Sequence, residues 1–272
     1  MCIRDSNCTV LFPTNEEGVI QPSYQKKIPG MHLLEKADLV ILGLRFRNLP
    51  DEDMKFFDDY LESGRPIIAT RTSTHSFRIP EERKYAKYSF NAKDPWVGGF
   101  GQQVLGDTWI SHHGKHGKQS TRGVVNKKFA DHPILKELGN VWGPTDVYGI
   151  KNLPEAAKVL LHGQVLEGMQ TDSKAVDGEL NDPMMPVAWT KTWKTDSGKE
   201  SRIFCTTMGA ATDFESEGLR RLIVNAAYWS LDLSIEGKTD VEIVDEYKPT
   251  QFGFRKFKKN RTAKDYDLKM KK

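Results

Sequence analysis

Residues 38–70 read DLVILGLRFRNLPDEDMKFFDDYLESGRPIIAT, and this stretch decides the fold. Residues 38–44 form a nearly continuous apolar run of strand length, typical of a parallel strand that is covered on both faces. A helix should follow, because Pro50 and the acidic residues after it suit a first helical turn. Its apolar positions recur at helical spacing: Met54, Phe57, Tyr60 and Leu61. Beyond Gly64, residues 66–70 predict the next strand, so the order indicates a doubly wound α/β sheet.

Further strands and one more helix are expected outside this stretch. Residues 9–12 predict a short strand before it. Residues 187–191 and 202–207 predict two strands, which a turn at 196–199 would join as an antiparallel hairpin. The last strong element is a helix over 214–230, whose apolar positions share one face. Two more features complete the pattern: a strand at 158–161 and a capping box of Thr212 with Glu215.

Residues 72–149 are dense in loops and hold five of the seven histidines. Glycine pairs and aromatic side chains interrupt any helical or strand periodicity there. A long irregular segment of this kind is typical of a functional rim or of a layer that covers a sheet.

The composition suits a single folded domain. The 272 residues are 38% hydrophobic and carry a formal charge of +3, with acidic and basic residues mixed along most of the chain, so no nucleic-acid partner is expected. No apolar run approaches the roughly 20 residues that cross a bilayer, so no membrane partner is expected either. Cys2, Cys8 and Cys205 have neither metal-ligand spacing nor the arrangement of a disulfide framework. Self-association stays open.

Three segments are expected along the chain. Residues 1–7 begin Met-Cys-Ile-Arg-Asp-Ser, which resembles translated adapter sequence, and we expect a non-native addition to an N-terminally truncated fragment. Residues 8–247 form the single α/β domain. Residues 248–272 form a basic tail, expected to be solvated and frayed. Because a leader could have been lost with the start, the compartment stays open between the cytoplasm and export.

Several short segments share their order with one known family. That order over residues 8–231 argues against coincidence, although no segment is specific alone. The segments are RTSTH at 71–75, GGFG at 98–101, WISH at 109–112, DHPI at 131–134, GPTDVY at 143–148, PVAWT at 186–190 and IFCTTMG at 203–209. In these segments the chain resembles the ThuA-like, or trehalose-utilisation, family.

The resemblance implies a flavodoxin-like, doubly wound and mostly parallel sheet related to class I glutamine amidotransferases, and the hairpin adds an antiparallel portion. In those enzymes the strand that matches residues 66–70 ends in a nucleophilic cysteine. Residues 70–75 contain no cysteine, so thiolate chemistry is not expected. Family members usually carry histidine after the glycine that matches Gly209, whereas this chain has Ala210. The family's first, central strand is not found, so we expect a gap or a rearranged edge beside residues 38–44.

Three residues in these motifs are candidates for catalysis: His75, His112 and Asp146. His75 follows the end of a predicted parallel strand, where open α/β sheets bind ligands. Imidazole titrates near neutrality, so His75 and His112 could share proton transfer while Asp146 orients one of them. The structural alternatives are a loop histidine bonded to the backbone and a loop-capping aspartate.

Five further side chains are candidates for ligand binding: Arg45, Arg71, Gln103, Trp109 and Tyr148. The arginines suit a carboxylate or a phosphate, with pairing to acidic neighbours as the alternative. Trp109 and Tyr148 suit the apolar face of a sugar, and the amide of Gln103 suits its hydroxyls. A core position is the alternative for Trp109. His132 and Cys205 are expected to be structural.

The sequence commits to no cofactor, and a divalent metal is the one alternative. In a helix, His112 and His116 would share a face at i and i+4 and could hold a metal together with His75. The neighbouring glycines argue against that helix. A polar role in catalysis or in sugar binding is therefore preferred for His112.

These residues favour a sugar-active hydrolase or isomerase whose partner is a small-molecule carbohydrate, such as a disaccharide or an oxidised sugar. The alternative is a non-catalytic carbohydrate-binding or scaffold module. Convergence of His75, His112 and Asp146 on one site would favour catalysis, whereas scattered positions would favour binding or scaffolding.

Overall fold

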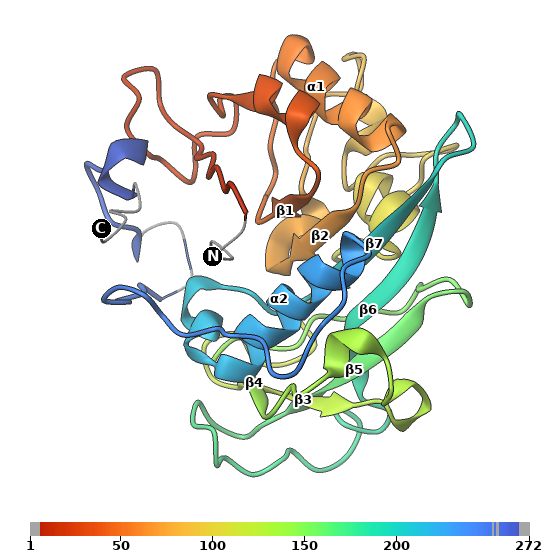
Figure 1. The fold of residues 1–272 in the computed structure, drawn as a ribbon, viewed down its shortest axis with the longest axis vertical. Coiled ribbons are helices and arrows are strands. Elements are labelled where there is room, and N and C mark those ends of the chain that lie inside the picture. The colour runs from red at the N-terminus through yellow and green to blue at the C-terminus, as the bar shows by residue number, and fades with distance from the viewer. Residues whose placement is uncertain (1–5, 252, 254–255, 267–272) are drawn as a thin grey trace.

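The computed structural model describes residues 6–251, 253 and 256–266. Its centre is a curled sheet of seven strands in the order β1-β2-β7-β6-β5-β3-β4 (Figure 1). The strands are β1 (Val40–Leu42), β2 (Ile67–Thr70), β3 (Thr121–Val125), β4 (Val141–Gly143), β5 (Lys158–Val165), β6 (Met185–Lys194) and β7 (Glu200–Thr206). The α-helices are α1 (Asp51–Glu62) and α2 (Glu217–Ser230), and none of the described helices is long and apolar enough to span a membrane.

The stretch 38–70 folds as strand, helix and strand, as predicted. Strands β1, β2 and β7 pair in parallel, with β2 between the other two. Among the described residues β1 pairs only with β2, so it lies at the edge of the sheet, where the sequence predicts a gap or a rearranged edge. The expectation that residues 38–44 are covered on both faces is wrong, because Ile41 of this edge strand is 43% exposed.

The sheet is mixed and not mostly parallel, which corrects the prediction. Strands β7, β6, β5, β3 and β4 pair antiparallel in succession. The predicted hairpin is confirmed, since Lys194 pairs with Glu200 across the turn. Strands β3 and β4 arise inside the segment that the sequence predicts as irregular, and they extend the antiparallel part at the far edge.

Alternation along the central strands divides the core between the two faces of the sheet. Ile67 and Ala69 of β2 face the cluster that includes α1, whereas Ile68 faces the cluster that includes α2. Strand β7 alternates in the same way, with Ile203 and Cys205 on the side of α1. The two helices therefore cover opposite faces, which leaves the carboxyl ends of β2 and β7 as a shared rim.

Two local expectations are corrected by the structure. Residues 9–12 form no strand, and nearby pairing is limited to a bridge between Thr14 and Ile20. Helix α2 is capped by Ser216, whose side chain accepts from the Leu219 amide, in place of the predicted capping box.

The basic tail is not simply frayed where it is described. The Ile20 amide donates to the Arg261 carbonyl at 2.7 Å, and the Phe12 and Tyr266 rings lie 5.5 Å apart. The tail thus returns to the N-terminal loop. Of the predicted non-native addition, residues 1–5 lie outside the described residues, as do residues 267–272 of the tail.

Candidate functional site

The site begins at the turn that follows β2. This turn, Arg71–His75, is a short 3-10 helix at the carboxyl end of a fully buried parallel strand. Arg71 adopts φ 43°, a left-handed conformation that is uncommon for a residue with a side chain. Its amide donates to the Met208 carbonyl beyond the end of β7, which fixes the turn against the neighbouring strand. Strained backbone of this kind persists where the surrounding structure enforces it, often at functional sites.

Asp146 lies after β4, and its side chain is fully buried. Arg71 Nη2 donates to Asp146 Oδ1 at 3.0 Å, and Arg71 Nη1 donates to the Asp146 carbonyl at 2.7 Å. Arg71 Nη1 also donates to the Thr207 carbonyl at 2.9 Å. The guanidinium therefore joins the turn after β2 to the ends of β7 and β4.

Two histidines share the same carboxylate. His112 Nδ1 lies 2.6 Å from Asp146 Oδ2, and His116 Nδ1 lies 2.8 Å from Asp146 Oδ1. We call Asp146, Arg71, His112 and His116 the Asp146 cluster. Residues 112 and 148 form an antiparallel bridge that places His112 beside the aspartate, and the turn after it returns His116 to the same point.

The charge state of Asp146 follows from its surroundings. Burial by itself would raise the pKa of this carboxyl. The guanidinium of Arg71 and the hydrogen bonds from His116 and His112 outweigh burial, and they hold the pKa below its ordinary value. Asp146 is therefore a buried anion that fixes the rings of two partly exposed histidines, whose side chains are 39% and 49% exposed.

His75 occupies a neighbouring position and not the cluster itself. It is 3% exposed, and its Nδ1 lies 3.3 Å from the Thr74 hydroxyl. Burial lowers the pKa of His75 to about 3, with further lowering by Arg45, Arg71 and His112, so the ring is neutral near pH 7. Among the predicted catalytic residues, the structure therefore bonds His112 to Asp146 and places His75 next to them.

His75, Trp109 and Tyr148 form an aromatic wall that borders the Asp146 cluster. The His75 ring lies 5.1 Å from Trp109 and 6.2 Å from Tyr148, and His112 lies 5.6 Å and 5.5 Å from the same two rings. Arg71 stacks over Tyr148 at 3.9 Å. Burial raises the pKa of Tyr148, although Arg71 opposes the shift, so its phenol stays protonated. Trp109 Nε1 is buried without a hydrogen-bond partner among the described residues.

The remaining ligand-binding candidates differ in their relation to this wall. Arg45 lies over the Phe46 ring at 4.7 Å, and Phe46 lies 4.9 Å from His75, so Arg45 borders the wall. Burial lowers the pKa of Arg45. Gln103 lies on the π-helical turn Gly101–Leu105, where its amide donates to the Val97 carbonyl. The hydrogen bond of its side chain is thus local and does not include the cluster.

The structure also shows relationships that the sequence does not reveal. Arg71 anchors a carboxylate 75 positions away, and His116 joins Asp146 through a turn instead of a helix. The sequence places Arg71 and His116 in or near the family-like motifs, but a motif carries no information on which side chains contact one another. His132 and Cys205 are structural, as expected: His132 accepts from the Ile134 amide, and Cys205 is fully buried.

The donor atoms of His112, His116 and Asp146 lie within 4.8 Å of one another. Two imidazoles and a carboxylate are ligands that transition metals accept. Among the described residues, His75 does not belong to this group of donor atoms, so the alternative set with His75 is not formed.

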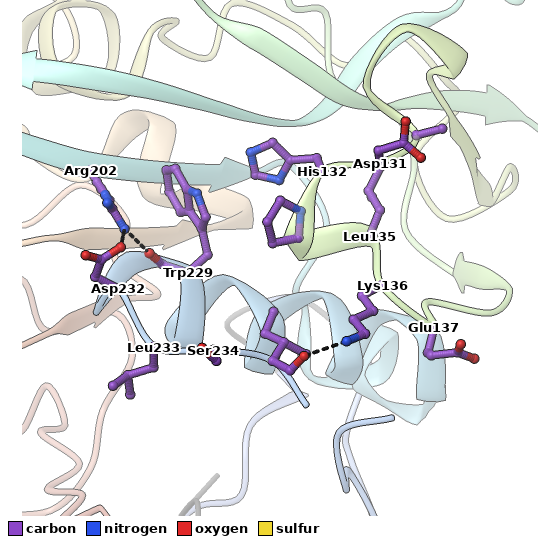
Figure 2. Close-up of a pocket in the computed structure, with 13 residues that line it drawn as sticks. Asp131, His132, Leu135, Lys136, Glu137, Arg202, Trp229, Asp232, Leu233 and Ser234 are labelled. Atoms are coloured by element: carbon purple, nitrogen blue, oxygen red, sulfur yellow. Dashed lines mark hydrogen bonds and ion pairs between the residues drawn. The ribbon is translucent and has the colours of Figure 1, made fainter. Parts of the chain in front are cut away.

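Two hollows lie away from the Asp146 cluster. A cavity of about 740 Å³ is bordered by His132, Lys136, Arg202 and Trp229, between residues 130–137 and the end of α2 (Figure 2). A smaller one of about 400 Å³ shares Arg202 with it. Arg202 lies near the start of β7, at the opposite end of the strand from the cluster, and none of the predicted site residues lines either cavity. The buried charge, ring contacts and shared carboxylate mark the Asp146 cluster as the stronger candidate.

Comparisons with known proteins agree on one family. The family model ThuA, described as trehalose utilisation, matches residues 25–230. A solved ThuA-like protein from Parabacteroides merdae ATCC 43184 is 17% identical, with a TM-score of 0.48 over 81% of this chain and 80% of that chain. Another from Bacteroides uniformis ATCC 8492 is 16% identical, with a TM-score of 0.46 over 76% and 75% of the two chains. No curated protein matches the chain.

Proposed function

The chain belongs to the ThuA, or trehalose utilisation, family, and from that premise we propose that it is a carbohydrate-active hydrolase or isomerase that works at the Asp146 cluster. The substrate class is a disaccharide or an oxidised sugar. This location is supported by the position of the cluster at the carboxyl ends of β2 and β7, where open parallel sheets bind their ligands. The proposed chemistry depends on proton transfer by histidine, because the turn after β2 contains no cysteine that could act as a nucleophile.

The observation that carries the proposal is the contact between His112 and Asp146. When Nδ1 donates to the buried carboxylate, the other ring nitrogen of His112 holds a lone pair and can accept a proton. Asp146 fixes the tautomer and stabilises the imidazolium that forms, as a carboxylate does in a catalytic triad. The 39% exposure of the His112 side chain leaves it accessible to a substrate.

The other candidates take supporting roles in this proposal. His75, being neutral, orients a substrate oxygen by hydrogen bonding and does not supply a charge. Trp109 and Tyr148 border the apolar face of a sugar ring. Arg45 binds an acidic or carbonyl oxygen at the edge of the wall.

The finer description of the fold is also a proposal. The parallel strands β1, β2 and β7, with helices on opposite faces, support a flavodoxin-like core of the glutamine amidotransferase type. The left-handed residue directly after β2 supports it too, because enzymes with a nucleophile on a tight strand-to-helix turn strain the same position. Here that position holds Arg71, which cannot act as the nucleophile.

The rival proposal is a non-catalytic carbohydrate-binding or scaffold module. The aromatic wall around His75 supports binding as well as it supports catalysis. The two proposals differ in turnover, since a binding module holds the sugar without converting it.

The test follows trehalose, other disaccharides and their oxidised forms by NMR in the presence of the purified protein. Catalysis predicts a new sugar product and a loss of about 10²- to 10⁴-fold in kcat for His112→Gln. The control is His32→Gln, an exposed histidine on the turn Met31–Lys36, which should keep wild-type turnover. Full turnover after replacement of both His75 and His112 would rule the catalytic proposal out, and sugar binding without turnover by the wild type would favour the rival.

A further inference from the structure

We infer that His112, His116 and Asp146 form a binding site for one transition-metal ion of the zinc, cobalt or manganese type. The inference deepens the proposed function by giving the same site a cofactor, and it rests on that proposal only for the role of the site in catalysis. Metal binding itself can be measured without any substrate.

The first support is geometry. Three donor atoms from three separate side chains lie within 4.8 Å of one another, and each histidine presents Nδ1 to the carboxylate at 2.6 Å or 2.8 Å. A tetrahedral ion with bonds of about 2.0–2.1 Å separates its ligand atoms by about 3.3 Å. Each ring would therefore move away from the carboxylate by about 0.5–0.7 Å, and donor atoms that lie as far as 4.8 Å apart would move closer together. Gly117 lies next to His116 in this turn, and a β-carbon at that position would meet nothing within 4 Å.

The second support is the ligand chemistry. Two imidazole nitrogens and one carboxylate oxygen suit zinc, cobalt, iron or manganese, whereas magnesium and calcium prefer sites made of oxygen. Three protein ligands leave further coordination positions open, which is typical of catalytic sites and not of structural ones. The partial exposure of both histidine side chains gives water or a substrate access to those positions.

The third support is the outer shell around the carboxylate. Ligating carboxylates are usually held by further hydrogen bonds, and Arg71 holds Asp146 through both its side chain and its carbonyl. Arg71 occupies only one of the roughly four acceptor positions of the carboxylate. Its charge is also shared with the Thr207 carbonyl and the Tyr148 ring, so it orients Asp146 while leaving it able to bind a cation.

An ion here would bind the Nδ1 lone pair of each histidine, so each ring would carry its proton on Nε2, and the ion would neutralise the buried carboxylate. It would supply Lewis-acid polarisation of a sugar oxygen or a bound water of lowered pKa. His112 would then hold the ion and would no longer accept the proton itself, a role that the bound water would take, and Tyr148 and Trp109 would still border the sugar ring.

The test uses the full chain, stripped of metal with a chelator and titrated with Co²⁺ and with Zn²⁺. We expect one equivalent to bind by calorimetry, together with the visible absorption of Co²⁺ in a nitrogen and oxygen site. His116→Ala should weaken binding at least about tenfold, because loss of an outer-shell group alone has an effect of that size. The matched control is His113→Gln: this histidine is next to His112 in sequence, but its Nε2 donates to the Leu180 carbonyl, so affinity should stay unchanged.

The outcomes separate this inference from the proposed function. A folded, metal-free wild type that binds neither ion, or equal binding by the wild type and by the His112→Ala and His116→Ala variants, overturns the metal site. Sugar turnover that survives chelation but is lost in His112→Gln would then leave the proposed function standing. Specific metal binding without turnover of any sugar would contradict the proposed function alone.

Discussion

Arg71 and Asp146 are joined twice, through a side-chain ion pair at 3.0 Å and through a hydrogen bond from the guanidinium to the aspartate carbonyl at 2.7 Å. Both side chains are buried, with 8% and 0% exposure. The pair connects the turn after β2 with the loop after β4, so the positions of His112 and His116 depend on it. A contact of this kind is expected to stabilise the fold and the site together.

Arg71→Met should lower the free energy of unfolding by about 3–5 kcal/mol, because it leaves the Asp146 carboxylate buried without its main partner. The measurement is denaturant unfolding at neutral pH. The matched control is Lys55→Met, which breaks the exposed ion pair with Asp59 on α1 and should change the same quantity far less, because solvent screens exposed pairs. Equal effects of the two substitutions would show that the buried pair contributes no more to stability than the exposed pair.

The lowered pKa of His75 predicts that the free energy of unfolding depends on pH. Its pKa falls from an ordinary value near 6.5 to about 3 in the folded protein, so the unfolded chain binds the extra proton between those values. Stability should therefore decrease as the pH falls from about 6.5 towards 3, by up to about 1.4 kcal/mol per pH unit. His75→Gln should reduce this slope by about one proton. His132, with a pKa lowered to about 4, adds to the wild-type slope in the same direction and remains in the variant. An unchanged slope would mean that His75 is not held in its neutral form.

Replacing Gly101 tests whether the turn after β2 depends on close packing against this glycine. A β-carbon on Gly101 would lie 2.1 Å from the Thr74 carbonyl oxygen, within the turn that carries Arg71 and His75. Gly101→Ala should cost about 1–3 kcal/mol of stability through overpacking and should lower activity by moving the turn. Gly117→Ala is the control, since its β-carbon would meet nothing within 4 Å and only its φ of 71° opposes the change. If Gly101→Ala proves as mild as the control, the turn is free to shift without consequence.

Much of the fold could be predicted from the sequence because its elements carry their own patterns. The apolar run at 38–44, the helical spacing from Met54 to Leu61 and the hairpin at 196–199 each depend on neighbours in sequence. Strands β3 and β4 could not be predicted in the same way, since they are short and their faces contact segments far along the chain. The edge position of β1 likewise depends on which strands assemble beside it, a property of the whole sheet.

The site could be predicted only in part for the same reason. The motifs singled out His112 and Asp146, and the structure bonds them at 2.6 Å. The roles of Arg71 and His116 depend on contacts 75 and 30 positions apart, which no local pattern records. The glycines argue against a helix over His112 and His116, and the structure has a glycine-containing turn there that brings both rings to the same carboxylate.

Trp109 offers the most direct test of where a ligand lies. Its buried Nε1 has no partner among the described residues, whereas Nε1 of the buried Trp189 donates to the Leu105 carbonyl at 2.7 Å. Trp189→Phe loses a hydrogen bond and leaves a carbonyl unsatisfied, so it should cost about 1 kcal/mol more stability than Trp109→Phe. Denaturant unfolding of both variants measures the difference.

The same pair of variants separates a structural tryptophan from one that binds a ligand. If the free N–H of Trp109 donates to a sugar oxygen, Trp109→Phe should weaken sugar binding by about tenfold, the value of one hydrogen bond of about 1.4 kcal/mol. Trp189→Phe should leave that affinity unchanged, because its ring lies in the core on the side of α1. Equal affinities for both variants would mean that the aromatic wall packs the turn after β2 and contributes no hydrogen bond to the ligand.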